Sequence, residues 1–266
     1  MYNKFLIVAS KEDVAGINIT TQLSQFPNKG NFSFYLLDKD IVNTENLDLE
    51  KINLFDFVIF ASKHVSSSGE KTLSVHTPSN WRSADYGGEA GKVCPSSALF
   101  FKQLFSKLSE NAKESDLKNY KVTMETTHHG PLINKPCVFI EIGPTETEWK
   151  DKRAAFIVAK TISDIMDSFS ENPYNEVAVA IGGPHYCPSF NKIQESSNVA
   201  ISHVISQNAF PLTEAMVKEA IEKTEEEIDM ILLDWKGLGK TEHKQEVLKI
   251  LDKFYIPKKK TGEVGK

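Results

Sequence analysis

The 266-residue sequence has few cysteines and no long hydrophobic run. Its three cysteines, Cys94, Cys137 and Cys187, are widely spaced and form no C-x-x-C pair, which argues against a disulfide framework and fits a reducing compartment. The apolar stretch at residues 5–9 is too short for a signal peptide, and no other run is long enough to span a bilayer. We therefore expect a cytoplasmic protein without a membrane partner.

The chain also lacks an excess of positive charge. Its formal net charge is -5 and its isoelectric point is near 5.9. Proteins that coat a nucleic-acid backbone are generally basic, so this balance argues against non-specific binding and against a DNA partner. It still permits a protein that grips one end of an RNA through a local patch.

Repeats and low-complexity linkers are missing as well, and predicted strands alternate with predicted helices along the chain. Apolar runs typical of strands lie at residues 5–9, 32–37, 55–61, 122–126, 137–143, 177–181, 199–205 and 230–233. Helical patterns lie at about 10–26, 95–108, 145–172, 213–227 and 241–254.

This alternation predicts an α/β fold with a mostly parallel central sheet and helices on both faces. We expect a single domain over residues 1–256, with a loop-rich excursion at about 62–91. The basic segment at 257–266 is expected to be a disordered tail.

Two adjacent histidines, His128 and His129, follow one predicted strand and precede a Gly-Pro turn. On a strand they would point to opposite faces, whereas in a loop they can converge. Taken alone, such a pair is more often structural, with one ring bonded to the backbone and the other in solvent. The next predicted strand carries a carboxylate, Glu141.

Five of the seven histidines lie in loops after predicted strands or in the excursion, namely His64, His76, His128, His129 and His185. The other two, His203 and His243, look structural or solvated. In open parallel sheets the carboxyl ends of the strands lie along one edge, where ligands bind. We therefore expect the loops that carry these histidines to converge.

Two chemistries fit such a cluster. Neutral imidazoles with a carboxylate suit a zinc ion, which lowers the pKa of bound water to about 7, and the candidate ligands are His64, His76, His128 and His185. No compact zinc signature such as H-E-x-x-H is present. The alternative is a histidine general base with separate donors for an oxyanion.

Candidate hydrogen-bond donors for this oxyanion occur in two segments. Ser66 and Ser67 belong to a serine run that, in isolation, is more typical of a solvated loop. Gly182 and Gly183 follow the predicted strand at 177–181 and offer backbone N–H groups near Tyr186. We predict that these five residues contact the substrate.

Five short motifs occur in order: S-K-H-V-S at 62–66, L-S-V-H at 73–76, T-H-H-G-P at 127–131, E-I-G-P-T-E at 141–146 and G-G-P-H-Y at 182–186. This ordered set resembles the D-aminoacyl-tRNA deacylase family of archaea and plants. The segments at 8–16 and 233–237 resemble it too, so the resemblance covers nearly the whole chain. The chain departs from the family at Ser79, where a glycine is usual, and at Pro144, where a serine is frequent; each departure affects a local turn.

The resemblance implies a phosphorylase/hydrolase-like α/β fold and hydrolysis of the ester between a D-amino acid and the tRNA 3′ end, with D-tyrosyl-tRNA as an expected substrate. It also implies zinc, without identifying its ligands. Only the matching histidines and Glu141 are carried over as site candidates. We predict catalytic roles for His64, His128, His129 and Glu141, the last as an orienting group or a base.

The partner is then the acceptor end of a D-aminoacyl-tRNA, bound by a monomer. Cations of the excursion that could assist are Lys63, Lys71, Arg82 and Lys92, although each is more often a solvated surface residue. Two other functions stay open at this point. One is a metal-dependent amidase or carboxypeptidase-like hydrolase, and the other is a non-enzymatic RNA-binding protein.

Overall fold

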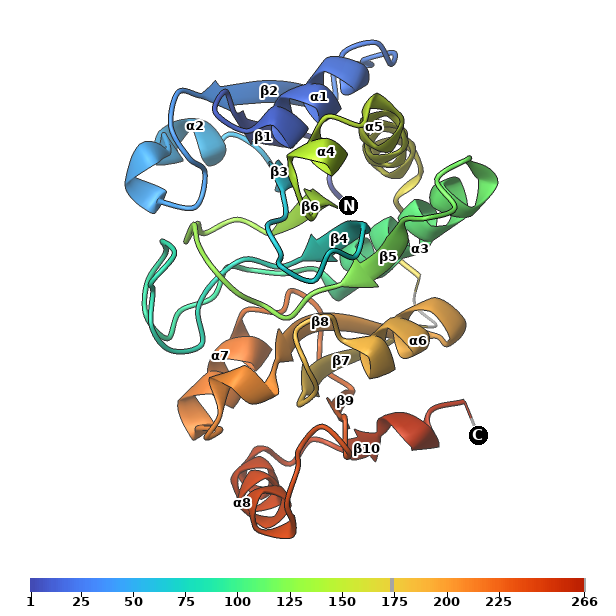
Figure 1. The fold of residues 1–266 in the computed structure, drawn as a ribbon. Helices are drawn as coiled ribbons and strands as arrows, with labels where there is room; N and C mark the ends of the chain where they lie inside the picture. Colours follow the sequence, from blue (N-terminus) through green and yellow to red (C-terminus); the bar gives the residue numbers. More distant parts are fainter. Residues whose placement is uncertain (173–174, 266) are drawn as a thin grey trace.

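In a computed structural model, which describes residues 1–172 and 175–265, the chain forms two β-sheets flanked by helices (Figure 1). The first sheet has the strand order β2-β1-β3-β6-β4-β5. Its strands are β1 (Phe5–Ser10), β2 (Phe32–Leu37), β3 (Phe57–Lys63), β4 (Thr72–His76), β5 (Lys121–Met124) and β6 (Cys137–Gly143).

Strand direction changes once within the first sheet. Strands β1, β2, β3 and β6 run parallel to one another, whereas β4 pairs antiparallel with β6 and parallel with β5. The predicted α/β class with a mostly parallel sheet is confirmed. The predicted excursion at 62–91 is only partly a loop, because β4 lies inside it and is inserted between β6 and β5.

The second sheet is parallel throughout, in the order β10-β9-β7-β8. Its strands are β7 (Glu176–Ile181), β8 (Val199–Ile205), β9 (Met230–Leu233) and β10 (Lys258–Lys260). It lies beside the β5 edge of the first sheet (Figure 1). Two sheets thus replace the single one expected.

The predicted disordered tail at 257–266 is wrong over its described part, because β10 pairs with β9. Three consecutive lysines suggest disorder by composition, but lysine is also common on exposed edge strands. Lys258 pairs with Asp252 and Lys259 with Glu176, which neutralises part of the charge. The end of the predicted tail, Lys266, lies outside the described residues.

Three helices cover one face of the first sheet. They are α1 (Val14–Leu23), α3 (Ala98–Glu114) and α5 (Lys152–Ser168), and α3 also packs on β8 of the second sheet. The other helices are α2 (Leu49–Ile52), α4 (Glu146–Trp149), α6 (Pro188–Ser196), α7 (Glu214–Glu222) and α8 (Thr241–Leu251). The helix expected over 145–172 is split because Asp151 caps a new helix start by accepting from the Arg153 N–H. The end of that prediction borders residues 173–174, which lie outside the description.

One hydrophobic core joins both sheets, since Ile59 of β3 and Ile201 of β8 belong to the same buried cluster. This continuity supports the single domain over 1–256, which we keep as a proposal. Among the described residues, no helix combines the length and apolar character needed to cross a membrane.

Phe100 of α3 anchors this core: it is fully buried and its ring centroid lies 4.0 Å from that of Phe57. We expect Phe100→Ala to lower the free energy of unfolding by about 3–5 kcal/mol, because it removes apolar contacts and leaves a cavity. Urea denaturation measures this. The control Leu54→Ala, at a side chain 71% exposed, should change stability by less than about 0.5 kcal/mol. Equal losses in the two variants would contradict the assignment.

Candidate active site

The site is built on the face of the first sheet opposite α1, α3 and α5. Across this face, Phe60, Phe139 and His76 are neighbours in register, and the rings of His76 and Phe139 stack with centroids 5.1 Å apart. In the next row, Glu141 lies opposite Ser74. Two buried ionisable residues, His76 and Glu141, thus occupy adjacent rows of this face, with the apolar rings of Phe60 and Phe139 beside His76.

The expected reason for convergence, a shared edge of parallel strand ends, is wrong. Strand β5, which precedes His128, runs antiparallel to β3, and β7, which precedes His185, belongs to the other sheet. The groups meet because the antiparallel β4–β6 pair brings the end of β4 to the middle of β6. The second sheet then contributes His185, whose carbonyl oxygen accepts a hydrogen bond from the Thr126 N–H (3.0 Å).

His64 directly follows β3 and is buried between two carboxylates. Its Nδ1 lies 3.1 Å from Glu125 Oε1 and 3.6 Å from Glu141 Oε2, and its Nε2 is 2.8 Å from the Tyr186 hydroxyl. Gly143 makes room for the ring, since a Cβ there would lie 2.9 Å from His64 Cβ and Cδ2. The predicted contact residue Tyr186 is therefore part of the site.

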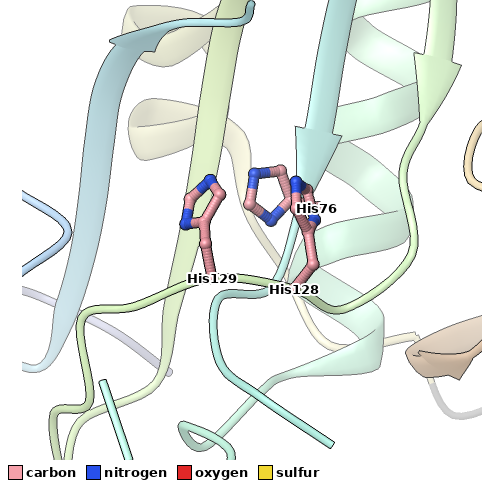
Figure 2. A group of neighbouring side chains, drawn as sticks. All are labelled: His76, His128 and His129. Carbon is pink, nitrogen blue, oxygen red and sulfur yellow. The ribbon is translucent and has the colours of Figure 1, made fainter. Parts of the chain in front are cut away.

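His76, His128 and His129 form a second group (Figure 2), with ring centroids 4.2–4.8 Å apart. In each ring Nδ1 lies close to a backbone carbonyl oxygen: that of Thr77 for His76, Thr126 for His128 and Gly130 for His129. A carbonyl can only accept, so Nδ1 carries the proton and, in the neutral ring, Nε2 keeps its lone pair. Adjacent histidines converge because they lie in a loop, where His129 adopts φ +41°.

Glu125 was not among the predicted site residues. It directly follows β5, is 1% exposed, and its Oε2 lies 3.0 Å from His185 Nε2 and 3.5 Å from His128 Nε2. The available sequence signal was a carboxylate that ends an apolar run three residues before the His-His pair. Together with Glu141, it gives the site two buried negative charges.

These contacts shift the pKa values of the histidines in opposite directions. Burial lowers the pKa of His64, but a hydrogen bond to Glu141 and the charges of Glu125 and Glu141 outweigh it and raise that pKa to about 10. Burial and neighbouring imidazoles hold the pKa of His128 well below 6.5 and lower the pKa of His129 to about 4. Burial raises the pKa of each carboxyl, yet the histidine contacts lower it more. At neutral pH His64 is therefore cationic, whereas His128 and His129 are neutral.

Three sets of side chains could hold a metal ion, each with donor atoms within 4.8 Å of one another: His76, His128 and His129; His64, Glu125 and His185; and His76, Glu125 and Glu141. The four predicted ligands, His64, His76, His128 and His185, are thus divided between the first two sets. The residues fit a metal, because His76 Nε2 is buried without a hydrogen-bond partner among the described residues, and the buried Glu125 Oε1 has only its ion pair with His64 there. His76 Nε2 also faces Glu141 Oε2 at 3.6 Å, an arrangement that a metal cation beside both atoms would stabilise.

Four predicted contact residues lie away from the cluster. Ser66 bonds to Ser68 Oγ, and Ser67 is exposed in the same loop. Gly182 and Gly183 pack on the turn after β9, where a Cβ on Gly183 would lie 3.0 Å from Asp234 Oδ2, and the Gly182 N–H donates to Ile205 O. In the described structure none of the four lines the cleft above the histidines.

That cleft has a volume of about 780 Å³ and contains His64, His128, His129, His185 and Glu141 in its wall. Its remaining charged lining is mostly acidic: Glu12, Asp13, Asp40 and Asp85 against Lys63. The cleft therefore favours a cationic or neutral ligand over a phosphate.

Of the four cations expected to assist RNA binding, three already have partners. Lys71 pairs with Glu148 and Lys92 with Glu219. Arg82 donates to the carbonyl oxygens of Ala209 and Pro211. Only Lys63 of this set lines the cleft, and its ammonium also lies over the Trp149 ring.

The D-aminoacyl-tRNA deacylase family model matches residues 52–258. Relatives named D-aminoacyl-tRNA deacylase include proteins of Thermococcus onnurineus and Methanocaldococcus jannaschii, each 32% identical to this chain. These alignments cover 87% and 88% of this chain and 91% of each relative. A crystal structure of a conserved protein of unknown function matches with a TM-score of 0.87 and 29% identity, covering 98% of this chain and 96% of that one.

We expect Glu125→Gln to lower the pKa of His64 from about 10 towards its ordinary value near 6.5, because one of the two facing negative charges is removed. A raised histidine pKa stabilises the fold fully below pH about 6.5, and this contribution is lost as the pH rises through about 10. The variant should therefore lose less stability over that range.

An NMR titration of His64 in metal-stripped protein measures the change, with the signal assigned by its loss in His64→Gln. Glu70→Gln is the matched control, since Glu70 is exposed and pairs with Lys121. An unchanged His64 titration in Glu125→Gln would contradict the electrostatic assignment.

Proposed function

The chain belongs to the D-aminoacyl-tRNA deacylase family, whose members are hydrolases of the aminoacyl-tRNA ester bond, and we propose that it removes D-amino acids from the tRNA 3′ end at the cluster of His64, His128, His129 and Glu141. The observation that carries this proposal is the convergence of these imidazoles and carboxylates in one cleft. An aminoacyl ester is already reactive, so the site need supply only moderate activation.

We propose zinc as the cofactor, held by His76, His128 and His129. Three imidazoles whose Nδ1 protons are fixed by backbone carbonyls match the ligand set of a catalytic zinc site with an open fourth position. When bound, such an ion would lower the pKa of a coordinated water to about 7. His64, Glu125 and His185 would be the second candidate set.

The chain's own groups have distinct proposed tasks. His64 is cationic at neutral pH and would stabilise the negative charge that develops on the ester carbonyl oxygen. Because both ring nitrogens of His64 already have partners, the proton for the departing ribose oxygen would pass through the Tyr186 hydroxyl, 2.8 Å from His64 Nε2. Glu141, which contacts both His64 and His76, would orient the two rings. The Tyr186 hydroxyl is hydrogen-bonded to Nε2 of His64 and helps to hold the ring in place.

Chiral selection would come from steric exclusion of the L side chain, with D-tyrosyl-tRNA among the substrates. The proposed role is quality control in translation, which would act in the cytoplasm on the acceptor end of tRNA. We propose that the protein acts as a monomer. The acidic lining of the cleft supports contact with the aminoacyl end rather than with the phosphate backbone.

His128→Ala and His129→Ala should each lower deacylation of D-Tyr-tRNA at least about 100-fold, the scale expected for loss of a group that acts in the reaction. Their melting temperatures should fall no further than that of the chelated wild type, because both rings border the cleft and their loss removes a metal ligand rather than core packing. His243→Ala, at an exposed position on α8, is the matched control and should keep full activity. Full activity in both cluster variants would reject the assignment.

Chelation should remove about one equivalent of zinc, lower the melting temperature and abolish deacylation, and zinc alone should restore all three. Elemental analysis of the purified protein gives the metal content independently of activity. His76→Ala should fail to retain the ion. Full activity in metal-free protein would instead favour His128 or His129 as a general base, since both rings are neutral at pH 7.

A further inference from the structure

A large aromatic side chain, Tyr86, stands exposed in the wall of the cleft. It is 76% exposed, although it shares this wall with His128 and His129. Within residues 1–172 and 175–265, its ring stacks on no other aromatic ring and its hydroxyl group makes no hydrogen bond. Its role in the packing of the protein is therefore small, and its position suggests contact with a ligand.

The backbone around Tyr86 is held firmly against the histidine loop. The Tyr86 carbonyl oxygen accepts a hydrogen bond from the Gly130 N–H (2.8 Å), next to His129. The Asn80 amide donates to the Gly87 carbonyl (2.7 Å), and a Cβ on Gly87 would lie only 1.9 Å from Val42 O. Such close packing holds the Tyr86 main chain beside the histidine loop, so the side chain projects from a defined place in the cleft wall.

We propose that Tyr86 is a stacking platform for the adenine base of the 3′-terminal nucleotide of the tRNA. This inference rests on the proposed function. The scissile ester is attached to the ribose of that nucleotide, so an ester held at the histidines leaves the adenine one sugar away. The Tyr86 backbone is hydrogen-bonded to the residue that follows His129, and Tyr86 lines the same cleft as the histidines, so its side chain borders the space that this nucleotide would occupy.

The charge of the cleft favours a base over a phosphate at this position. Asp85 precedes Tyr86, and Asp40 and Glu12 also line the cleft, so a phosphate beside the ring would meet like charge. An adenine is neutral and presents a flat face. Aromatic side chains bind single-stranded nucleic-acid ends through this kind of stacking, because every base has a flat π-face.

The same ring could instead contact the amino-acid side chain, and substrate variation separates the two. Deacylation is measured for wild type, Tyr86→Phe and Tyr86→Ala on D-Ala and D-Tyr esters of one acceptor minihelix. A second minihelix, loaded chemically, carries an abasic ribose in place of the terminal adenine. Tyr255→Ala is the matched control, because Tyr255 is 95% exposed and lies in the last part of the chain, beyond α8.

We expect Tyr86→Ala to raise KM by at least about fivefold, and to the same extent for the D-Ala and D-Tyr esters, while kcat changes little. Tyr86→Phe and Tyr255→Ala should behave as wild type. The abasic minihelix should raise the wild-type KM by a similar factor and leave Tyr86→Ala unaffected, because both changes remove the same contact.

Three results would overturn the inference: no change in Tyr86→Ala, a loss confined to the D-Tyr ester, or full sensitivity of Tyr86→Ala to the missing base. The second of these would assign the ring to the amino-acid side chain. A wild-type protein that hydrolyses none of the D-aminoacyl esters would reject the proposed function instead, so the two failures are distinguishable.

Discussion

Two buried carboxylates at the cleft, Glu125 and Glu141, set the constraint on which the rest of the site depends. An ionised carboxylate in a low-dielectric interior is costly unless opposite charge and hydrogen bonds surround it. Here imidazoles provide that compensation, with His64 between the two carboxylates and His185 on Glu125. The buried carboxylates therefore depend on the imidazoles for charge compensation, and the raised pKa of His64 depends in turn on the carboxylates.

The two carboxylates also divide the imidazoles by charge. His64 lies within reach of both and holds its proton, whereas His128 and His129 lie among other imidazoles and are neutral. This division gives a hydrolytic site both a positive group for an oxyanion and unprotonated nitrogens for a metal or a proton. A cleft whose other lining is acidic restricts the ligand further, because it accepts the aminoacyl end of a tRNA more readily than its phosphates.

Both sheets are needed to assemble this arrangement. The first sheet supplies His76 and Glu141 from its β4–β6 pair, and the second supplies His185. Backbone bonds from Thr126 to His185 and from Thr127 to Val204 tie the His-His loop to the second sheet. A shift between the two sheets would therefore change the distances within the cluster. The continuous core beneath α3 holds the sheets in place and so helps to fix the geometry of the site.

Local sequence patterns correctly predicted the α/β class, most strands and the grouping of the histidines. These features can be predicted because apolar runs and polar strand ends depend only on neighbouring residues along the chain. Ordered motifs were sufficient for the family. The composition of Lys258–Lys260 wrongly predicted disorder, because these residues form a strand that pairs with β9 despite their charge. Gly182 and Gly183 were expected at the substrate, but the turn at Asp234 occupies the space beside them.

Only the tertiary structure decided which groups meet. Strand direction in a sheet is set by pairing between distant segments, so the antiparallel entry of β4 could not be read from its own residues. Glu125 is identified as a site residue by the same long-range pairing, because β5 places it beside the end of β4. The residue types and their order supply the chemistry available to this protein, a set of imidazoles and carboxylates at strand ends. Long-range pairing and burial decided their distances and charge states, because both depend on residues far apart in the chain.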